Sequence, residues 1–283
     1  MLRPAALLLL AALLAPALLA PPVRAQAPAG FVDISTGPTG GPMVRTARDV
    51  AVAPDGTVYA SSLFRTGPLL GSPGVARRVG NAWVKLPGVF SAEPTRIAVA
   101  PDGALWAVGT FRIDGGPLQY LARFDGTGWT DAGAAFSSQV TGLAIATDGT
   151  VVVTGDFSSF NSTTAWYAAQ FRGGVWSAIA GAPNPSVDLL QRAGPPVADG
   201  AAFYVPFVRR QFSQGPSEFR LARVAGGAWA DSGAPLPAEL LAAGPAGQLY
   251  AASSTVFQYT GCAWVALAGT FQRLVEALAR LML

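Results

Sequence analysis

The sequence predicts an all-β fold, a β-propeller of four-stranded antiparallel blades. Two turns that recur in the same order carry this prediction. The first is an Asp-Gly turn between two apolar runs, with copies at Asp55, Asp102, Asp148 and Asp199 and a degenerate copy at Ala246. The second is a Gly-x-x-Trp turn, whose tryptophans are Trp83, Trp129, Trp176, Trp229 and Trp264. The first turns lie 46 to 51 residues apart, a period typical of propeller blades.

The runs before the Asp-Gly turns identify the first strand of each blade. In residues 97–100, Ile-Ala-Val-Ala, large and small apolar side chains alternate, and the same alternation occurs in residues 50–53 and 143–146. A half-exposed strand would instead alternate apolar with polar residues. Both faces of these strands are therefore expected to lie between neighbouring sheets. Asp-Gly favours a tight hairpin turn because glycine adopts positive φ without a steric clash.

Residues 1–27 are predicted to be a secretory signal peptide. Arg3 forms a short basic start, residues 5–20 are apolar, and Ala25-Gln26-Ala27 has the small-x-small form of a cleavage site. The alternative is a membrane anchor, but the apolar run is short for a span and is broken by Pro16. We therefore expect export to the periplasm, the cell surface or the medium, with no membrane insertion after cleavage.

Residues 28–270 are predicted to form the propeller domain, with five full blades. The expected blades are residues 44–89, 92–136, 138–182, 187–236 and 239–269, of which the fourth has the weakest first strand. Residues 31–36 resemble the fourth strand of a blade, so they are expected to pair with the last blade and close the ring. Residues 271–283 are a tail or the truncated start of a further blade. Two alternatives fit the sequence: a closed five-bladed ring and an incomplete six-bladed ring.

Zero histidines and a single cysteine, Cys262, exclude most zinc and copper sites, Cys/His nucleophiles and Ser-His-Asp triads. No calcium-binding loop motif occurs, so no metal or cofactor is expected. Without residues 1–27 the chain has 17 basic and 16 acidic residues, a net charge of +1, and no long basic run. Nucleic acid is therefore not expected as a partner. The aspartates of the Asp-Gly turns recur so regularly that we interpret them as turn residues.

Two further sets recur in successive blades and are interpreted as structural. Phe64, Phe111 and Phe157 each lie nine residues after a turn aspartate, which favours packing between blades. A long polar side chain recurs in the third strand, and the set is Arg78, Arg123, Gln170, Arg223 and Gln258. These side chains are expected to lie along the outer wall.

The segments Gly109-Thr110-Phe111 and 121–129, LARFDGTGW, carry a resemblance to a known family. They resemble the kelch-like repeats of secreted bacterial β-propeller proteins, several of which carry a sorting domain for type IX secretion. The resemblance implies the fold, and most such proteins have no known activity. It does not imply the copper chemistry of kelch oxidases, which requires histidine ligands.

The loop between the second and third strands varies most among the repeats, and variable loops on a rigid scaffold usually carry recognition. The predicted binding residues on this loop face are Arg65, Arg112, Asp114, Phe160, Asn161, Trp166, Arg209, Arg210, Phe212 and Glu218. The sequence therefore predicts an exported, non-enzymatic protein that binds a protein or glycan through this face. The alternatives are a polysaccharide hydrolase or lyase that uses carboxylates alone, with Asp114, Asp156 or Glu218 as candidates, and a structural fragment of a larger surface protein.

Overall fold

The computed structural model describes residues 47–64, 72–80, 82–182, 190–210, 216–237, 240–243, 248–252, 255–261 and 263–267. Within these residues the regular structure is entirely β, and no helix is long and apolar enough to cross a membrane. The predicted signal peptide, the ring-closing strand at residues 31–36 and the tail at residues 271–283 lie outside the described residues.

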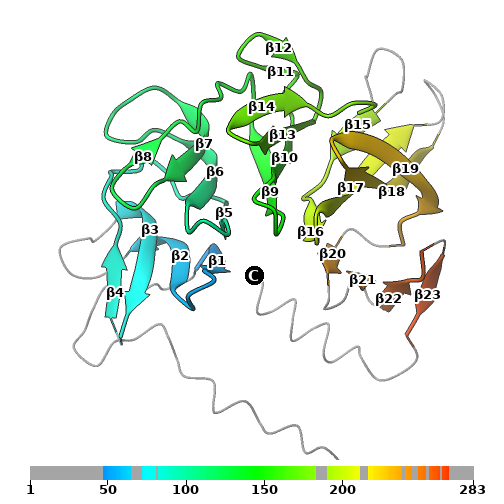
Figure 1. The fold of residues 1–283 in the computed structure, drawn as a ribbon, viewed down its shortest axis with the longest axis horizontal. Helices are drawn as coiled ribbons and strands as arrows, with labels where there is room; N and C mark the ends of the chain where they lie inside the picture. Colours follow the sequence, from blue (N-terminus) through cyan, green and yellow to red (C-terminus); the bar gives the residue numbers. More distant parts are fainter. Residues whose placement is uncertain are drawn as a thin grey trace, which may run out of the picture. The chain divides into compact units, whose positions relative to one another are not determined.

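Five antiparallel sheets follow one another along the chain (Figure 1). Sheet 1 contains β1 (Asp49–Val52), β2 (Val58–Phe64), β3 (Ser72–Val79) and β4 (Ala82–Lys85). Sheet 2 contains β5 (Arg96–Val99), β6 (Leu105–Phe111), β7 (Gln119–Phe124) and β8 (Trp129–Thr130). Sheet 3 contains β9 (Val140–Ile145), β10 (Val151–Gly155), β13 (Ala168–Arg172) and β14 (Val175–Ala178).

Sheets 4 and 5 continue the same plan. Sheet 4 contains β15 (Leu190–Ala193), β16 (Val197–Asp199), β17 (Ala202–Arg210), β18 (Ser217–Ala225) and β19 (Ala228–Pro235). Sheet 5 contains β20 (Leu240–Ala243), β21 (Leu249–Ala252), β22 (Val256–Tyr259) and β23 (Trp264–Ala266). The first strand of sheet 4 is split into β15 and β16, which both pair with β17. Pro195 and Pro196 separate them, because proline has no N–H to donate to a ladder.

The first strands of successive sheets contact one another: β1 contacts β5, β5 contacts β9, β9 contacts β16, and β16 contacts β20. Each sheet then runs through its strands in chain order. The prediction of a propeller-like fold of four-stranded antiparallel sheets is therefore confirmed. The number of blades and the closure of a ring stay predictions.

Three of the four Asp-Gly turns form as the sequence predicts, while Asp199 is the last residue of β16 and pairs with Ala202. The side chains of Asp55, Asp102 and Asp148 each accept a hydrogen bond from the backbone N–H two residues later, at 2.8, 2.9 and 2.9 Å. The glycines that follow have φ of +85°, +84° and +81°, a region that residues with a Cβ rarely adopt. The turn role of these aspartates is confirmed.

The core lies between the sheets. Phe111 is fully buried in a cluster with Val75 of sheet 1, and its ring lies 5.0 Å from that of Phe90. Phe157 is fully buried in the cluster between sheets 2 and 3, with its ring 4.7 Å from that of Phe136. The predicted packing role of these phenylalanines is confirmed, and nothing is described of the Phe64 side chain.

The segments between second and third strands differ from the predicted loops in two sheets. Residues 158–165 contain a small hairpin of β11 (Ser159–Phe160) and β12 (Thr163–Thr164). In sheet 4 the ladder between β17 and β18 extends to the pair Arg210–Ser217. Arg209, Arg210 and Glu218 therefore lie in strands and not in a loop, because the strands continue pairing beyond the apolar run.

Candidate active site

A hollow with two carboxylates in its lining lies between sheets 2 and 3. We call it the Asp102–Asp148 cleft. Its volume is about 270 Å³. The side chains that line it come from the β5–β6 turn, β6 and β7 of sheet 2, and from the β9–β10 turn and β13 of sheet 3; they include Asp102, Trp106, Arg123, Asp148 and Phe171.

Asp102 is held by both of its carboxylate oxygens. Its Oδ1 accepts the turn hydrogen bond from the N–H of Ala104, and its Oδ2 accepts a hydrogen bond of 3.3 Å from Nη2 of Arg123. The Asp102 side chain remains 63% exposed and that of Arg123 is 35% exposed. The ion pair is therefore open to solvent, where such a pair contributes little to stability.

Aromatic side chains form the wall behind this ion pair. The guanidinium carbon of Arg123 lies 5.8 Å from the centre of the Trp106 ring, a cation–π geometry. Trp106 is buried, and its ring lies 5.3 Å from that of Phe171 across the boundary between the two sheets. This packing orients Arg123 toward Asp102 and the cleft.

Asp148 approaches the cleft from the neighbouring sheet. The hydrogen bond from the N–H of Thr150 is the main reason why the pKa of this carboxyl is lowered, and the positive charge of Arg172 adds to the effect. The side chain is exposed. Asp148 is therefore an ionised carboxylate at neutral pH, which is the form required of a general base or a nucleophile.

The predicted loop-face residues do not line the Asp102–Asp148 cleft, and several of them form hydrogen bonds with backbone groups of adjacent loops. Asp114 accepts a hydrogen bond of 2.8 Å from the N–H of Val89, and Arg112 donates one of 3.0 Å to the carbonyl of Gly116. Asn161 accepts from Ala135 N–H and donates to the Gly133 carbonyl. These bonds give all three side chains a structural role in holding the loops together. A ligand-binding role for them stays a prediction.

Phe160 is not on an exposed face. It is 2% exposed and packs in the core between sheets 2 and 3, with its ring 5.7 Å from that of Phe136. The prediction that Phe160 lies on the loop face is wrong, because the β11–β12 hairpin turns this side chain inward. Trp166 is half-buried, and its ring lies 6.4 Å from that of Tyr167.

Arg209 and Glu218 belong to an ion-pair network across β17, β18 and β19. Arg220 lies at its centre, with Nη1 3.4 Å from Oε2 of Glu218 and Nε 3.0 Å from Oδ2 of Asp231. Arg209 reaches the same Asp231 at 3.9 Å. Glu218 is therefore paired rather than presented to a ligand. Arg65 and Phe212 lie outside the described residues.

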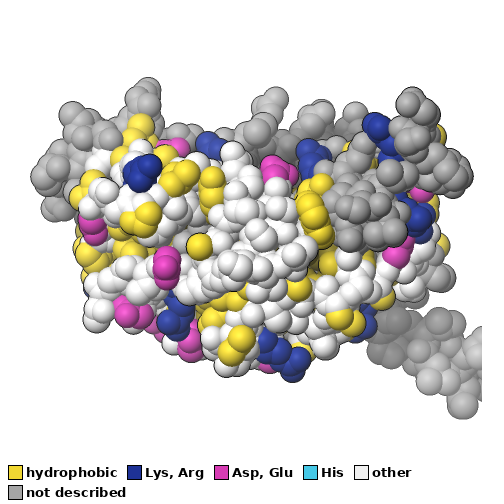
Figure 2. All heavy atoms as spheres, turned by 90° about the horizontal axis from the view of Figure 1, so that it is seen from above, with side chains coloured by type: hydrophobic (Ala, Val, Ile, Leu, Met, Phe, Trp, Pro, Cys, Tyr) yellow, Lys and Arg dark blue, Asp and Glu magenta, His cyan; other side chains and the backbone are white. Residues whose placement is uncertain are grey.

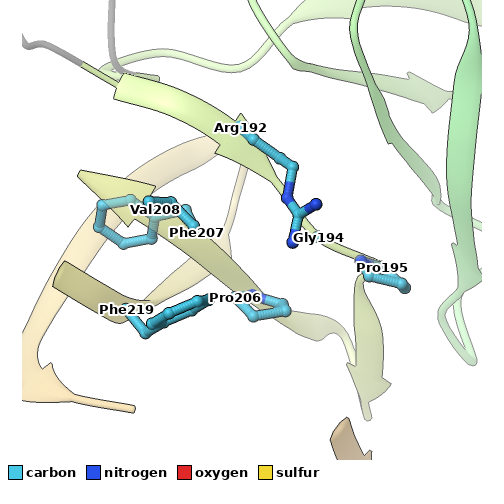
Figure 3. Close-up of a pocket in the computed structure, with 7 residues that line it drawn as sticks. All are labelled: Arg192, Gly194, Pro195, Pro206, Phe207, Val208 and Phe219. Atoms are coloured by element: carbon cyan, nitrogen blue, oxygen red, sulfur yellow. The ribbon is translucent and has the colours of Figure 1, made fainter. Parts of the chain in front are cut away.

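A smaller hollow of about 80 Å³ lies on sheet 4 (Figure 3). Figure 3 shows the Arg192 side chain on one side of it and the rings of Phe219 and Pro206 on another. Only Arg192 contributes a charged side chain to its lining. This hollow has no carboxylate for acid–base chemistry, which distinguishes it from the Asp102–Asp148 cleft.

Charges of both signs are interspersed on the described part of the face in Figure 2. Within the described residues, no three Cys, Asp or Glu side chains are grouped so that they could hold a metal ion.

No protein-family model matches the sequence, and no curated protein sequence matches it. Solved structures of similar shape include a Hadza microbial sialidase, with 13% identity, a TM-score of 0.45 and coverage of 76% of this chain and 56% of that one. An ulvan lyase of polysaccharide lyase family 25 has 11% identity, a TM-score of 0.41 and coverage of 77% and 68%. An endo-arabinase from Bacteroides thetaiotaomicron has 11% identity, a TM-score of 0.33 and coverage of 80% and 94%. The chain thus spans little more than half the length of the sialidase structure.

These three proteins are enzymes that act on glycans. The prediction of a non-enzymatic binding protein, and with it the prediction that the chain is not an enzyme, is contradicted by these names and is not taken further, although the likeness itself concerns the fold alone. The earlier prediction followed from the missing histidines, but carboxylates alone can catalyse glycan cleavage.

Proposed function

We propose that this protein is a glycoside hydrolase that cleaves a polysaccharide with carboxylates alone. One observation carries the proposal: Asp102 and Asp148, from turns of two successive sheets, line a single solvent-open cleft. Hydrolysis of a glycosidic bond requires two carboxyl groups on either side of the bond, one that donates a proton and one that is ionised. The proposal takes up the hydrolase alternative of the sequence analysis, with different residues.

Asp148 is assigned as the ionised group. Its lowered pKa keeps the carboxylate charged at neutral pH, so that it can activate water or attack the anomeric carbon. Asp102 is assigned as the proton donor to the leaving oxygen. A sugar hydroxyl that binds Arg123 in place of Asp102 would leave Oδ2 of Asp102 facing the bound sugar.

The size and lining of the cleft support a carbohydrate ligand. A volume of about 270 Å³ corresponds to roughly nine water molecules at about 30 Å³ each, which is room for one sugar ring. Arg123 and the two aspartates offer hydrogen bonds to hydroxyl groups, and Phe171 contributes apolar surface. Sites for small molecules commonly combine such apolar walls with a few polar groups.

The test is reducing-sugar release by the purified protein from xylan, arabinan, galactan, polygalacturonate, unsulfated chondroitin and chondroitin sulfate. Asp148→Asn and Asp102→Asn should each lower kcat on any cleaved polymer by at least about 100-fold, as expected for loss of an acid–base group. Asp55→Asn is the matched control, because Asp55 makes the same turn bond in sheet 1 outside the cleft. Release from none of the six polymers, or undiminished release by Asp148→Asn, contradicts the proposal.

We also infer that residues 1–27 are removed on export and that residues 28–270 form the catalytic domain as a propeller with kelch-like repeats. The basic start, apolar run and small-x-small site of the first 27 residues support this inference. N-terminal sequencing of the protein recovered outside the inner membrane should begin at Pro28. A mature protein that begins at Met1 would contradict it.

A further inference from the structure

Asp148 lines two clefts and not one. On its other side, between sheets 3 and 4, a second hollow of about 70 Å³ is lined by Asp148, Thr150, Gln170, Arg172 and Phe203. We call it the Arg172 cleft. A ligand bound at Asp148 can therefore contact both hollows, because one turn separates them.

The sizes of the two clefts indicate different occupants. The Arg172 cleft, at about 70 Å³, is roughly a quarter the size of the Asp102–Asp148 cleft, which suits a carboxylate or sulfate substituent better than a whole ring. The Asp102–Asp148 cleft, at about 270 Å³, is the one that has room for a ring. The small cleft therefore fits a side group of the unit next to the bond that is cleaved.

Arg172 gives the small cleft its charge preference. Its side chain is exposed at the end of β13, and within the described part of the chain it takes part in no ion pair. Gln170, which lines the same cleft, is buried and donates a hydrogen bond of 3.2 Å to the Ser177 hydroxyl. The charge of Arg172 also acts on the Asp148 carboxylate in the same cleft, but without an ion pair to that group the guanidinium can bind a carboxylate or sulfate through two parallel hydrogen bonds.

We propose that the substrate is an acidic polysaccharide, with an anionic substituent that binds Arg172 in the small cleft while the neighbouring ring occupies the Asp102–Asp148 cleft. This inference rests on the proposed hydrolase function. It adds the substrate class and a specificity residue, Arg172, which holds the substrate but takes no part in bond cleavage.

The experiment compares wild type, Arg172→Met and Arg172→Lys on the polymers of the same panel. Polygalacturonate and galactan test a carboxylate, and chondroitin sulfate and unsulfated chondroitin test a sulfate. The proposal expects cleavage of an acidic polymer, a KM about tenfold higher in Arg172→Met with kcat little changed, and partial recovery in Arg172→Lys. The KM of wild type should rise with NaCl concentration because salt screens the interaction, and that of Arg172→Met should rise less.

Two controls separate the outcomes. Arg77→Met removes an exposed arginine of sheet 1 that lines neither cleft and should leave KM unchanged. The umbelliferyl glycoside of the single sugar unit does not reach the small cleft, so Arg172→Met should hydrolyse it like wild type. Cleavage of neutral polymers alone, or an unchanged KM in Arg172→Met while Asp148→Asn is inactive, overturns the acidic-substrate inference and leaves the hydrolase proposal standing. Absence of turnover on all six polymers overturns both.

Discussion

The indole Nε1 of Trp176 in sheet 3 donates a hydrogen bond of 2.8 Å to the backbone carbonyl of Ala132, which follows the last strand of sheet 2. The equivalent tryptophan of sheet 2, Trp129, does the same at 2.9 Å to the carbonyl of Pro87 after sheet 1. The fourth-strand tryptophan therefore joins its own sheet to the preceding one, in addition to packing its ring in the core.

Replacing Trp176 with phenylalanine should destabilise the protein. The ring remains apolar, but the partly buried carbonyl of Ala132 loses its donor, at a cost of about 0.5–1.5 kcal/mol. We expect a fall in Tm of several degrees, since each kcal/mol corresponds to roughly 2–4 °C in a chain of this size. Thermal unfolding followed by circular dichroism measures it.

Trp264→Phe is the matched control for this change. Trp264 occupies the same position in sheet 5, but its Nε1 is buried without a hydrogen-bond partner among the described residues. Removing an unpaired buried donor should leave Tm unchanged or raise it. Equal losses in Trp176→Phe and Trp264→Phe would show that the ring, and not the hydrogen bond, accounts for the effect.

The turns made the fold predictable from the sequence. Asp-Gly and Gly-x-x-Trp act within a few residues, so each copy identifies two strand ends regardless of the rest of the chain. The partner of each tryptophan was not predictable, because Ala132 lies 44 residues before Trp176 and a backbone carbonyl has no sequence signature.

Gly142 is expected to be intolerant of a side chain. A Cβ at this position would meet Oγ1 of Thr154, and it would approach Cδ of Pro196 to 2.6 Å. Thr154 cannot move away freely, because its hydroxyl donates a hydrogen bond of 2.8 Å to the carbonyl of Gly194. Gly142→Ala should therefore lower the free energy of unfolding by about 1–3 kcal/mol through overpacking.

Gly128→Ala provides the comparison. A Cβ at Gly128 would meet no heavy atom within 4 Å, and its φ lies outside the left-handed region. Urea unfolding of both variants should show a lower midpoint for Gly142→Ala and a midpoint near that of wild type for Gly128→Ala. Comparable midpoints for Gly142→Ala and wild type would mean that sheets 3 and 4 separate easily at this point.

Asp125 should contribute to stability at neutral pH and lose that contribution in acid. Its Oδ1 accepts hydrogen bonds from the N–H groups of Thr127 and Gly128 and from the Thr127 hydroxyl. These bonds, led by the one from Gly128, lower the pKa of this carboxyl to about 2. Because the folded pKa lies below the unfolded one, the stabilisation is complete above about pH 4 and disappears as the pH falls toward 2.

Asp125→Asn should accordingly have a lower Tm than wild type at pH 7, and the difference should shrink as the pH approaches 2. Asp156→Asn serves as the control, because Asp156 is exposed and its side chain forms no hydrogen bond among the described residues. A difference between Asp125→Asn and wild type that stays constant from pH 7 to pH 2 would contradict this prediction.

The candidate site was harder to predict than the fold. The regular spacing of Asp102 and Asp148 correctly indicated turn residues, and for that reason it concealed that two of these turns meet at one cleft. That meeting depends on how successive sheets pack. The loop-face residues present the opposite problem, since the sequence cannot distinguish an asparagine that binds loop backbone, such as Asn161, from one that binds a ligand.

Asp49 provides a prediction of opposite sign to that of Asp125. Its carboxylate accepts a hydrogen bond of 2.8 Å from the N–H of Ile97, which links sheet 1 to sheet 2. Burial nevertheless raises the pKa of this carboxyl, and the hydrogen bond from Ile97 and the charge of Arg96 offset the effect only in part. A folded pKa above the unfolded one means that ionisation of Asp49 opposes folding. The cost of this ionisation appears as the pH rises from the unfolded pKa through the folded pKa.

In Asp49→Asn the amide oxygen can still accept the hydrogen bond from the N–H of Ile97, but no charge is buried. The variant should therefore be more stable than wild type at pH 7, and the gain should disappear near pH 3, where wild type is protonated. Thermal unfolding across this range measures the difference, and a variant that is less stable than wild type at pH 7 would show that the charge of Asp49 stabilises the contact between the two sheets.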